Sequence, residues 1–147
     1  EVSNPSGFFV AATQHTSGGN VACLRTWQSL AGSLSLEPKY IAGELGLLCA
    51  RGLIRQGSEL KGMVIAGCIA PDNWPPTGEQ LSSIAVQLDT EPTFLEANCS
   101  AVYHLDRLQR ERVLRFLQRI ADVFSHMAED RSLIYTRLQA IARLTSL

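Results

Sequence analysis

The stretch CIAPDNWPPTGEQL, residues 68–81, joins an apolar segment to the start of a helix across a tryptophan and two consecutive prolines. Thr77 and Gln80 match the capping-box pattern, which predicts a helix through GEQLSSIAVQL directly after the prolines. Because proline has a locked φ angle, the pair fixes how the chain turns from strand to helix. We therefore predict a strand, a rigid corner and a helix, with Trp74 held as a lid at the mouth of a pocket.

Two strands are predicted before this corner. The uncharged run MVIAGCIAP, residues 63–71, is typical of a central strand, and LGLLCARGLIR, residues 45–55, is typical of its neighbour. The QGSELKG segment between them predicts a hairpin connection. Gly52 lies inside the earlier strand, which indicates a bulge or the close approach of another group.

Strict alternation along residues 63–71 divides their side chains between two faces. One face carries Met63, Ile65, Gly67 and Ile69, and the other carries Val64, Ala66, Cys68 and Ala70. The second face is lined mainly by small side chains, which leave room above the sheet. Either a closely packed helix or a ligand can fill that room.

The N-terminal part contributes further elements. The run GFFVAAT, residues 7–13, is β-prone and predicts a strand, followed by a turn. Asn20 is a candidate N-cap for a helix over residues 21–34, which carries one apolar stripe. A second short helix is predicted near PTFLEANC, with Pro92 in its first turn.

Residues 108–144 contain no glycine or proline and predict one long helix. Apolar residues follow a heptad seam along it, interrupted by Arg131: Val113, Leu117, Ile120, Phe124, Met127, Ile134, Leu138 and Ile141. Extra apolar residues, Leu114, Phe116, Ala121 and Val123, widen the stripe in the first half. We expect the part up to about Met127 to pack on the sheet and the narrow second half to pair with the same helix of a second copy in a parallel homodimer.

The chain of 147 residues fits one domain of α+β class, with a core over residues 1–107 and the long helix over 108–147. Eight of the thirteen basic residues follow Asp106. They are not interleaved with aromatic residues or glycines, which favours a solvated helix face over direct nucleic-acid binding. The chain begins at Glu1 without an initiator methionine and ends inside a helical pattern, so we expect a domain of a longer protein.

No apolar run is long enough to cross a bilayer and no secretory leader is visible, so we expect a cytoplasmic domain without membrane insertion. The four cysteines, at positions 23, 49, 68 and 99, are too far apart for a CxxC pair and lack clustered histidines. This pattern predicts reduced thiols and no metal site. No glycine-rich loop of the phosphate-binding kind occurs, and no cofactor is predicted.

Four segments in this order, CARGLI, GMVIAGCIAP, WPPTGEQLSSIAVQL and the long C-terminal helix, resemble the ligand-binding domain named after the propanediol regulator PocR. The resemblance covers about residues 20–147. It implies a PAS-like antiparallel sheet with flanking helices that binds a small organic molecule ahead of a transcription factor, kinase, phosphatase or cyclic-dinucleotide synthase. It also implies that Cys49, Gly52 and Leu53 belong to the strand bordering the pocket and Gly67 to the facing strand. The chain departs from the family at Ala50, where many relatives have histidine, and in keeping only Cys23 of a cysteine-rich stretch.

The candidate ligand-binding residues combine apolar walls with a few polar or reactive groups, as small-molecule sites generally do. They are Phe9, Trp27, Gln28, Cys49, Arg51, Gly67, Cys68, Trp74 and His104. Cys49, His104 and Asp106 supply the residue types of a nucleophilic enzyme. However, His104 and Asp106 lie only two positions apart rather than as a base and its orienting group, so we do not predict an enzyme.

Two functions therefore stay open. The first is a small-molecule-binding sensory domain of a bacterial signal-transduction or transcription regulatory protein, which passes ligand occupancy to an output domain through the C-terminal helix. The alternative is a thiol- or haem-type redox sensor that uses Cys49, Cys68 or Cys23 as the responsive group.

Overall fold

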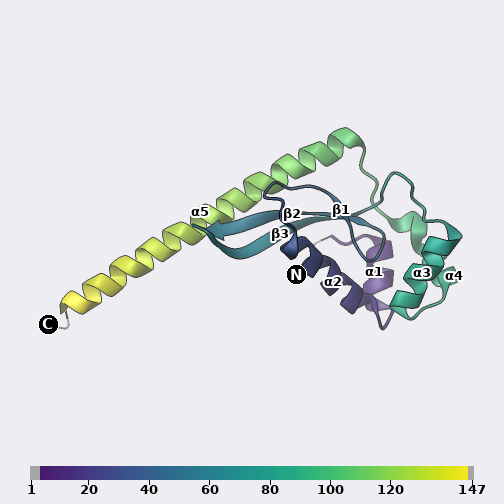
Figure 1. The fold of residues 1–147 in the computed structure, drawn as a ribbon, viewed down its shortest axis with the longest axis horizontal. Coiled ribbons are helices and arrows are strands. Elements are labelled where there is room, and N and C mark those ends of the chain that lie inside the picture. Colours follow the sequence, from purple (N-terminus) through teal and green to yellow (C-terminus); the bar gives the residue numbers. More distant parts are fainter. Residues whose placement is uncertain (1–3, 146–147) are drawn as a thin grey trace.

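The computed structural model describes residues 4–145 and is built around a three-stranded antiparallel sheet in the order β1-β2-β3. The strands are β1 (Ile41–Ala42), β2 (Leu48–Gln56) and β3 (Glu59–Ile69). The two long strands confirm the prediction, but the pairing of Gln56 with Glu59 makes their connection tighter than the predicted seven-residue segment. Figure 1 shows the sheet between α5 and the smaller N-terminal helices.

The helices confirm the α+β class. They are α1 (Gly7–Gln14), α2 (Gly19–Gly32), α3 (Gly78–Leu88), α4 (Pro92–Asn98) and α5 (Arg107–Thr145), with a short 3₁₀ turn at Cys99–Ala101. α2 begins with Gly18 as its N-cap rather than the predicted Asn20, which lies in the first turn of the helix.

The predicted strand over residues 7–13 is wrong, because this segment forms α1. The side chain of Ser6 accepts a hydrogen bond from the Phe9 N–H at 3.3 Å and so caps the helix. Phe8, Phe9, Ala11 and Ala12 are all buried in the core. A short apolar run that is buried on most sides shows no period, so its sequence does not separate a strand from a helix.

The corner after β3 forms as the sequence predicts. The Thr77 hydroxyl accepts from the Gln80 N–H at 3.4 Å, and the Gln80 side-chain oxygen accepts from the Thr77 N–H at 3.0 Å. This reciprocal pair is the predicted capping box, and α3 begins immediately after it. α4 begins at Pro92, as predicted.

α5 confirms the predicted long helix, and Figure 1 shows it passing along the sheet and continuing well beyond it. Its first half packs on β2, where Leu117 and Ala121 are buried. A Cβ atom at Gly52 would lie 2.8 Å from the Ala121 Cβ and 2.9 Å from the Leu117 carbonyl oxygen, so glycine permits the close approach of helix and sheet.

The sheet contact ends earlier than predicted. The Ser125 hydroxyl accepts from the Arg55 N–H at 3.0 Å, whereas Met127 is already exposed. Of the extra apolar residues in the first half, Ala121 is buried, but Phe116 and Val123 are exposed.

The small-residue face of β3 is covered by α5. Gly52 pairs with Val64, and Ala50 pairs with Ala66, so these side chains share the face against which Leu117 and Ala121 pack. Of the two occupants predicted for this face, the structure therefore has the helix.

Candidate functional site

An apolar groove of about 680 Å³ runs along β3, the edge strand of the sheet. We call it the β3 groove. It is lined by residues 4–6 before α1, Phe9 of α1, Trp27 of α2, Ile54 of β2, residues 63–68 of β3 and Phe124 of α5. Its volume lies within the range of about 300–1,000 Å³ that is usual for small-molecule sites.

A much smaller inner cavity lies behind the groove. It has a volume of about 10 Å³ and is lined by Phe9, Cys23, Thr26, Trp27, Gly43, Leu45, Leu47, Cys49 and Cys68. This is close to the smallest space that holds one water molecule. Phe9, Trp27 and Cys68 line both spaces, so these three side chains form the wall between the groove and the inner cavity.

Five of the nine predicted site residues meet at this wall and its surroundings: Phe9, Trp27, Cys49, Gly67 and Cys68. They come from α1, α2, β2 and β3. The groove also uses residues that the sequence did not assign to a site. Phe124 was predicted only as a seam residue, and its position at the end of the sheet-packed part of α5 is a signal that could have found it.

A β-bulge brings Cys68 to this wall. Leu48 pairs with Ile69 and Cys49 with Gly67, which leaves Cys68 as the extra residue of β3. Gly67 has φ 142° and Cys68 has φ 58°, a left-handed value that is uncommon outside glycine. A Cβ at Gly67 would lie 2.6 Å from the Cys49 Cα, so only glycine fits there.

The bulge overrides the predicted alternation. Alternation assigns Cys68 to the face of Val64 and Ala66, which α5 covers. Instead, the Cys68 Sγ lies 3.7 Å from the Cys49 Sγ, on the side of the sheet that faces α1 and α2. Either sulfur can donate in this contact. Hydrogen bonding to Cys68 lowers the Cys49 pKa to about 7, although burial acts in the opposite direction.

The neighbouring thiols have the opposite tendency. The pKa of Cys68 is raised by its hydrogen bond with Cys49 and by burial. Burial also raises the pKa of Cys23, with a smaller contribution from Cys49. The site therefore contains one thiol whose pKa is lowered, Cys49, beside two whose pKa is raised.

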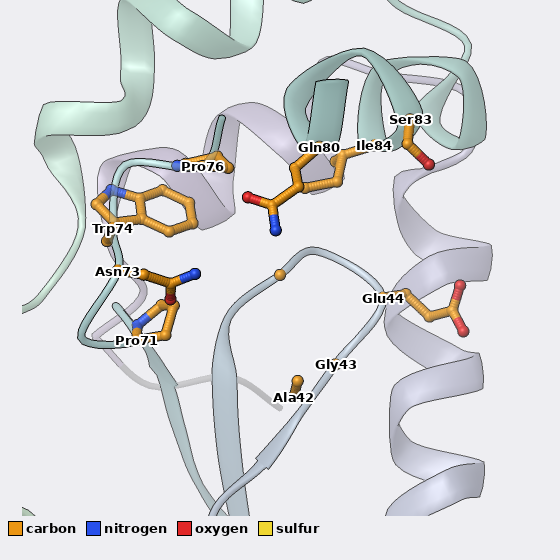
Figure 2. Close-up of a pocket in the computed structure, with 11 residues that line it drawn as sticks. Ala42, Gly43, Glu44, Pro71, Asn73, Trp74, Pro76, Gln80, Ser83 and Ile84 are labelled. Atoms are coloured by element: carbon orange, nitrogen blue, oxygen red, sulfur yellow. The ribbon is translucent and has the colours of Figure 1, made fainter. Parts of the chain in front are cut away.

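Trp74 lines a different cavity, which we call the α3 pocket. Figure 2 shows Trp74, Pro76 and Asn73 along one side of it, Gln80, Ser83 and Ile84 of α3 on another, and the loop after β1 across from them. The pocket has a volume of about 350 Å³ and shares Gly43 with the inner cavity.

Two contacts hold the Trp74 ring in this position. The indole Nε1–H donates to the Cys99 carbonyl oxygen at 2.8 Å, and the ring meets Phe8 edge to face with centroids 5.1 Å apart. Trp74 therefore forms the wall between the core and the α3 pocket, rather than a cover over the cavity that contains Cys49 and Cys68.

The other three predicted residues lie elsewhere. Arg51 is buried, and its guanidinium donates to the carbonyl oxygens of Ser33 and Ser35, which ties the segment after α2 to the sheet. Gln28 and His104 are exposed and are not among the described residues that line the groove, the inner cavity or the α3 pocket.

Polar side chains of the inner cavity and the groove already have hydrogen-bond partners within the protein. The Thr26 hydroxyl donates to the Ala22 carbonyl and accepts from the Glu44 N–H, and the Asn4 side chain accepts from the Tyr103 hydroxyl. An occupant of the groove therefore meets mainly apolar side chains and the backbone edge of β3.

Across residues 4–145, no group of three or more His, Cys, Asp or Glu side chains is arranged to hold a metal ion. Within the same residues, none of the helices has the length and apolar character required to span a membrane. Comparisons of the chain with known protein families, with characterised proteins and with solved structures found no match.

Proposed function

We propose that this domain binds a small, largely apolar organic molecule in the β3 groove and signals its presence through α5. It would serve as a cytoplasmic sensory domain of a bacterial signal-transduction or transcription regulatory protein. The observation that carries the proposal is the position of Phe124, which lines the groove and belongs to α5 where that helix leaves the sheet. A molecule bound beside Phe124 contacts the signalling helix directly.

The groove suits such a ligand in size and chemistry. Phe9 and Trp27 supply aromatic surface on one side, and Met63 and Ile65 supply aliphatic surface on the other. A ligand shifts a conformational equilibrium only by its differential affinity for the two states, commonly worth about 1–3 kcal/mol. Contact with Phe124 provides that difference if α5 changes position between the states.

The output step uses the part of α5 beyond the sheet. Ile134, Leu138 and Ile141 are exposed there and share one seam of the heptad pattern. We propose that a second copy of the chain covers this seam in a parallel dimer. At about 25 cal/mol per Å² of buried apolar surface, three such side chains from each copy contribute several kcal/mol before the costs of association.

A ligand that binds in the groove is expected to change the fluorescence of Trp27 but not that of Trp74. The test uses two matched variants, Trp74→Phe and Trp27→Phe, each of which keeps one tryptophan as the reporter. A panel of small neutral alcohols, ketones and amides is first screened by thermal shift, since a ligand at a hundredfold excess over its Kd adds about 2.7 kcal/mol of stability.

Each molecule that raises the melting temperature is then titrated into both variants. A change confined to the variant that retains Trp27 supports binding in the β3 groove. A change confined to the variant that retains Trp74 would instead place the ligand in the α3 pocket and contradict the proposed site.

The dimer is expected to dissociate when the seam is interrupted by a charge. Ile134→Asp places a carboxylate in the proposed interface, whereas the control Gln139→Asp introduces the same side chain on an exposed position outside the seam. Sedimentation should show a monomer for Ile134→Asp and a dimer for Gln139→Asp, with unchanged far-ultraviolet circular dichroism. Truncation after Asp130 should also give a folded monomer. A dimer of equal stability in all three would place the interface elsewhere.

A further inference from the structure

We propose that Cys49 and Cys68 form a dithiol site that reacts with small hydroperoxides and closes to a disulfide between β2 and β3. This inference goes beyond ligand binding in the β3 groove and does not depend on it. Its basis is the contact between the two sulfur atoms, which lie 3.7 Å apart, together with the bulge that creates this contact.

The backbone geometry suits a disulfide. Directly opposed residues of an antiparallel pair have Cα atoms about 4.5–5.5 Å apart, and the bulge places both Gly67 and Cys68 opposite Cys49. Disulfides join Cα atoms about 4.4–6.8 Å apart. We therefore expect the bond to close by rotation of the two side chains, without displacement of a strand.

The bulge also requires an unusual backbone. Cys68 adopts a left-handed φ of 58°, and Gly67 lies so close to Cys49 that a Cβ would clash with it. A regular strand would have placed Cys68 on the opposite face, against α5. The irregular backbone of Gly67 and Cys68 therefore brings the two thiols together.

An activated thiol lies close to the groove. Cys49 is only 2% exposed and lines the inner cavity, whereas Cys68 belongs to the wall between this cavity and the β3 groove. The lowered pKa of Cys49 raises the fraction of this thiol that is thiolate at neutral pH. The thiolate is the form that attacks peroxides.

The reaction proceeds in two balanced steps. The Cys49 thiolate attacks one peroxide oxygen, so that an S–O bond forms, the O–O bond breaks, and the departing oxygen takes up a proton and leaves as water or an alcohol. Cys68 then attacks the sulfur of the Cys49 sulfenic acid, the S–S bond forms, and hydroxide leaves with the Cys68 proton as water. The two thiols lose two electrons and two protons in total, and the peroxide is reduced.

The other two cysteines serve as internal comparisons. Cys23 lines the inner cavity, but burial raises its pKa and keeps it a thiol. Cys99 is buried at the start of the 3₁₀ turn, where its pKa is likewise raised by burial. We expect both to remain reduced at peroxide concentrations that oxidise Cys49.

The test is to treat the reduced full chain with increasing hydrogen peroxide, block the remaining thiols, and map the products by mass spectrometry of a non-reduced digest. The expected product is a Cys49–Cys68 cross-link, with the loss of two hydrogen atoms, two blockable thiols remaining and full reversal by dithiothreitol. The oxidation rate should rise with pH through about 7 and level off above it, because the fraction of Cys49 thiolate does so.

Two variants test the roles of the individual cysteines, and the wild-type experiment can be interpreted without them. Cys68→Ser should leave a sulfenic acid on Cys49 that dimedone traps, whereas the control Cys99→Ser should still form the cross-link. The proposal is overturned if peroxide converts Cys49 to sulfinic acid in the wild-type chain without any cross-link, or if the disulfide that forms contains Cys23 or Cys99.

Discussion

Replacing Phe8 by alanine is expected to lower the free energy of unfolding by about 3–5 kcal/mol. Phe8 is 0% exposed and meets the Trp74 ring edge to face, so its removal leaves a cavity at the corner that follows the sheet. A domain of this size has a total stability of about 5–15 kcal/mol. The variant should therefore lose a large part of the stability of the domain.

Urea denaturation followed by circular dichroism measures the loss for Phe8→Ala. The matched control is Phe116→Ala, since Phe116 is 64% exposed on α5 and its truncation leaves no internal cavity. We expect the control to change the free energy of unfolding by no more than about 0.5–1 kcal/mol. Similar losses in the two variants would show that α1 does not pack as described.

Leu117→Ala is expected to cost about 2–5 kcal/mol and to loosen α5 from the sheet. Leu117 is 2% exposed and lies against β2 beside Gly52, where helix and strand approach most closely. Because this contact anchors α5 to the sheet, the loss should be accompanied by faster amide hydrogen exchange in the first half of α5 and in β2.

Leu108→Ala is the matched control on the same helix, with the same change in side chain at a residue that is 57% exposed. It should leave both the free energy of unfolding and the exchange of β2 nearly unchanged. If Leu108→Ala destabilised the domain as much as Leu117→Ala, the stability of α5 would come from the helix itself rather than from its contact with the sheet.

The elements that the sequence predicted well have local causes. The capping box of Thr77 and Gln80 satisfies its own hydrogen bonds within four residues, and α3 begins there in the structure. α5 follows from a long segment free of glycine and proline with a helical apolar period. The hairpin strands follow from two apolar runs separated by turn residues.

Part of the candidate site could be predicted for the same reason, and part could not. The apolar character of Phe9 and Trp27 and the presence of thiols in both strands were visible in the sequence, and the structure brings them together. Arg51 was included in the same prediction by its residue type, and Trp74 by its place at the proline corner. Their positions depend on which backbone carbonyls they reach, Ser33 and Ser35 for Arg51 and Cys99 for Trp74, and those partners are distant in the chain.

The amino-acid sequence by itself determined the α+β class, the positions of the two long strands, the helix after the proline corner and the length of α5. In each case, hydrogen bonds and side-chain periodicity within a few residues are sufficient. Only the tertiary structure decided that residues 7–13 form a helix and that Cys68 turns toward Cys49. Both outcomes depend on packing between distant segments: α1 is buried in the core among other helices, and the bulge in β3 forms because Gly67 lets the two strands approach closely.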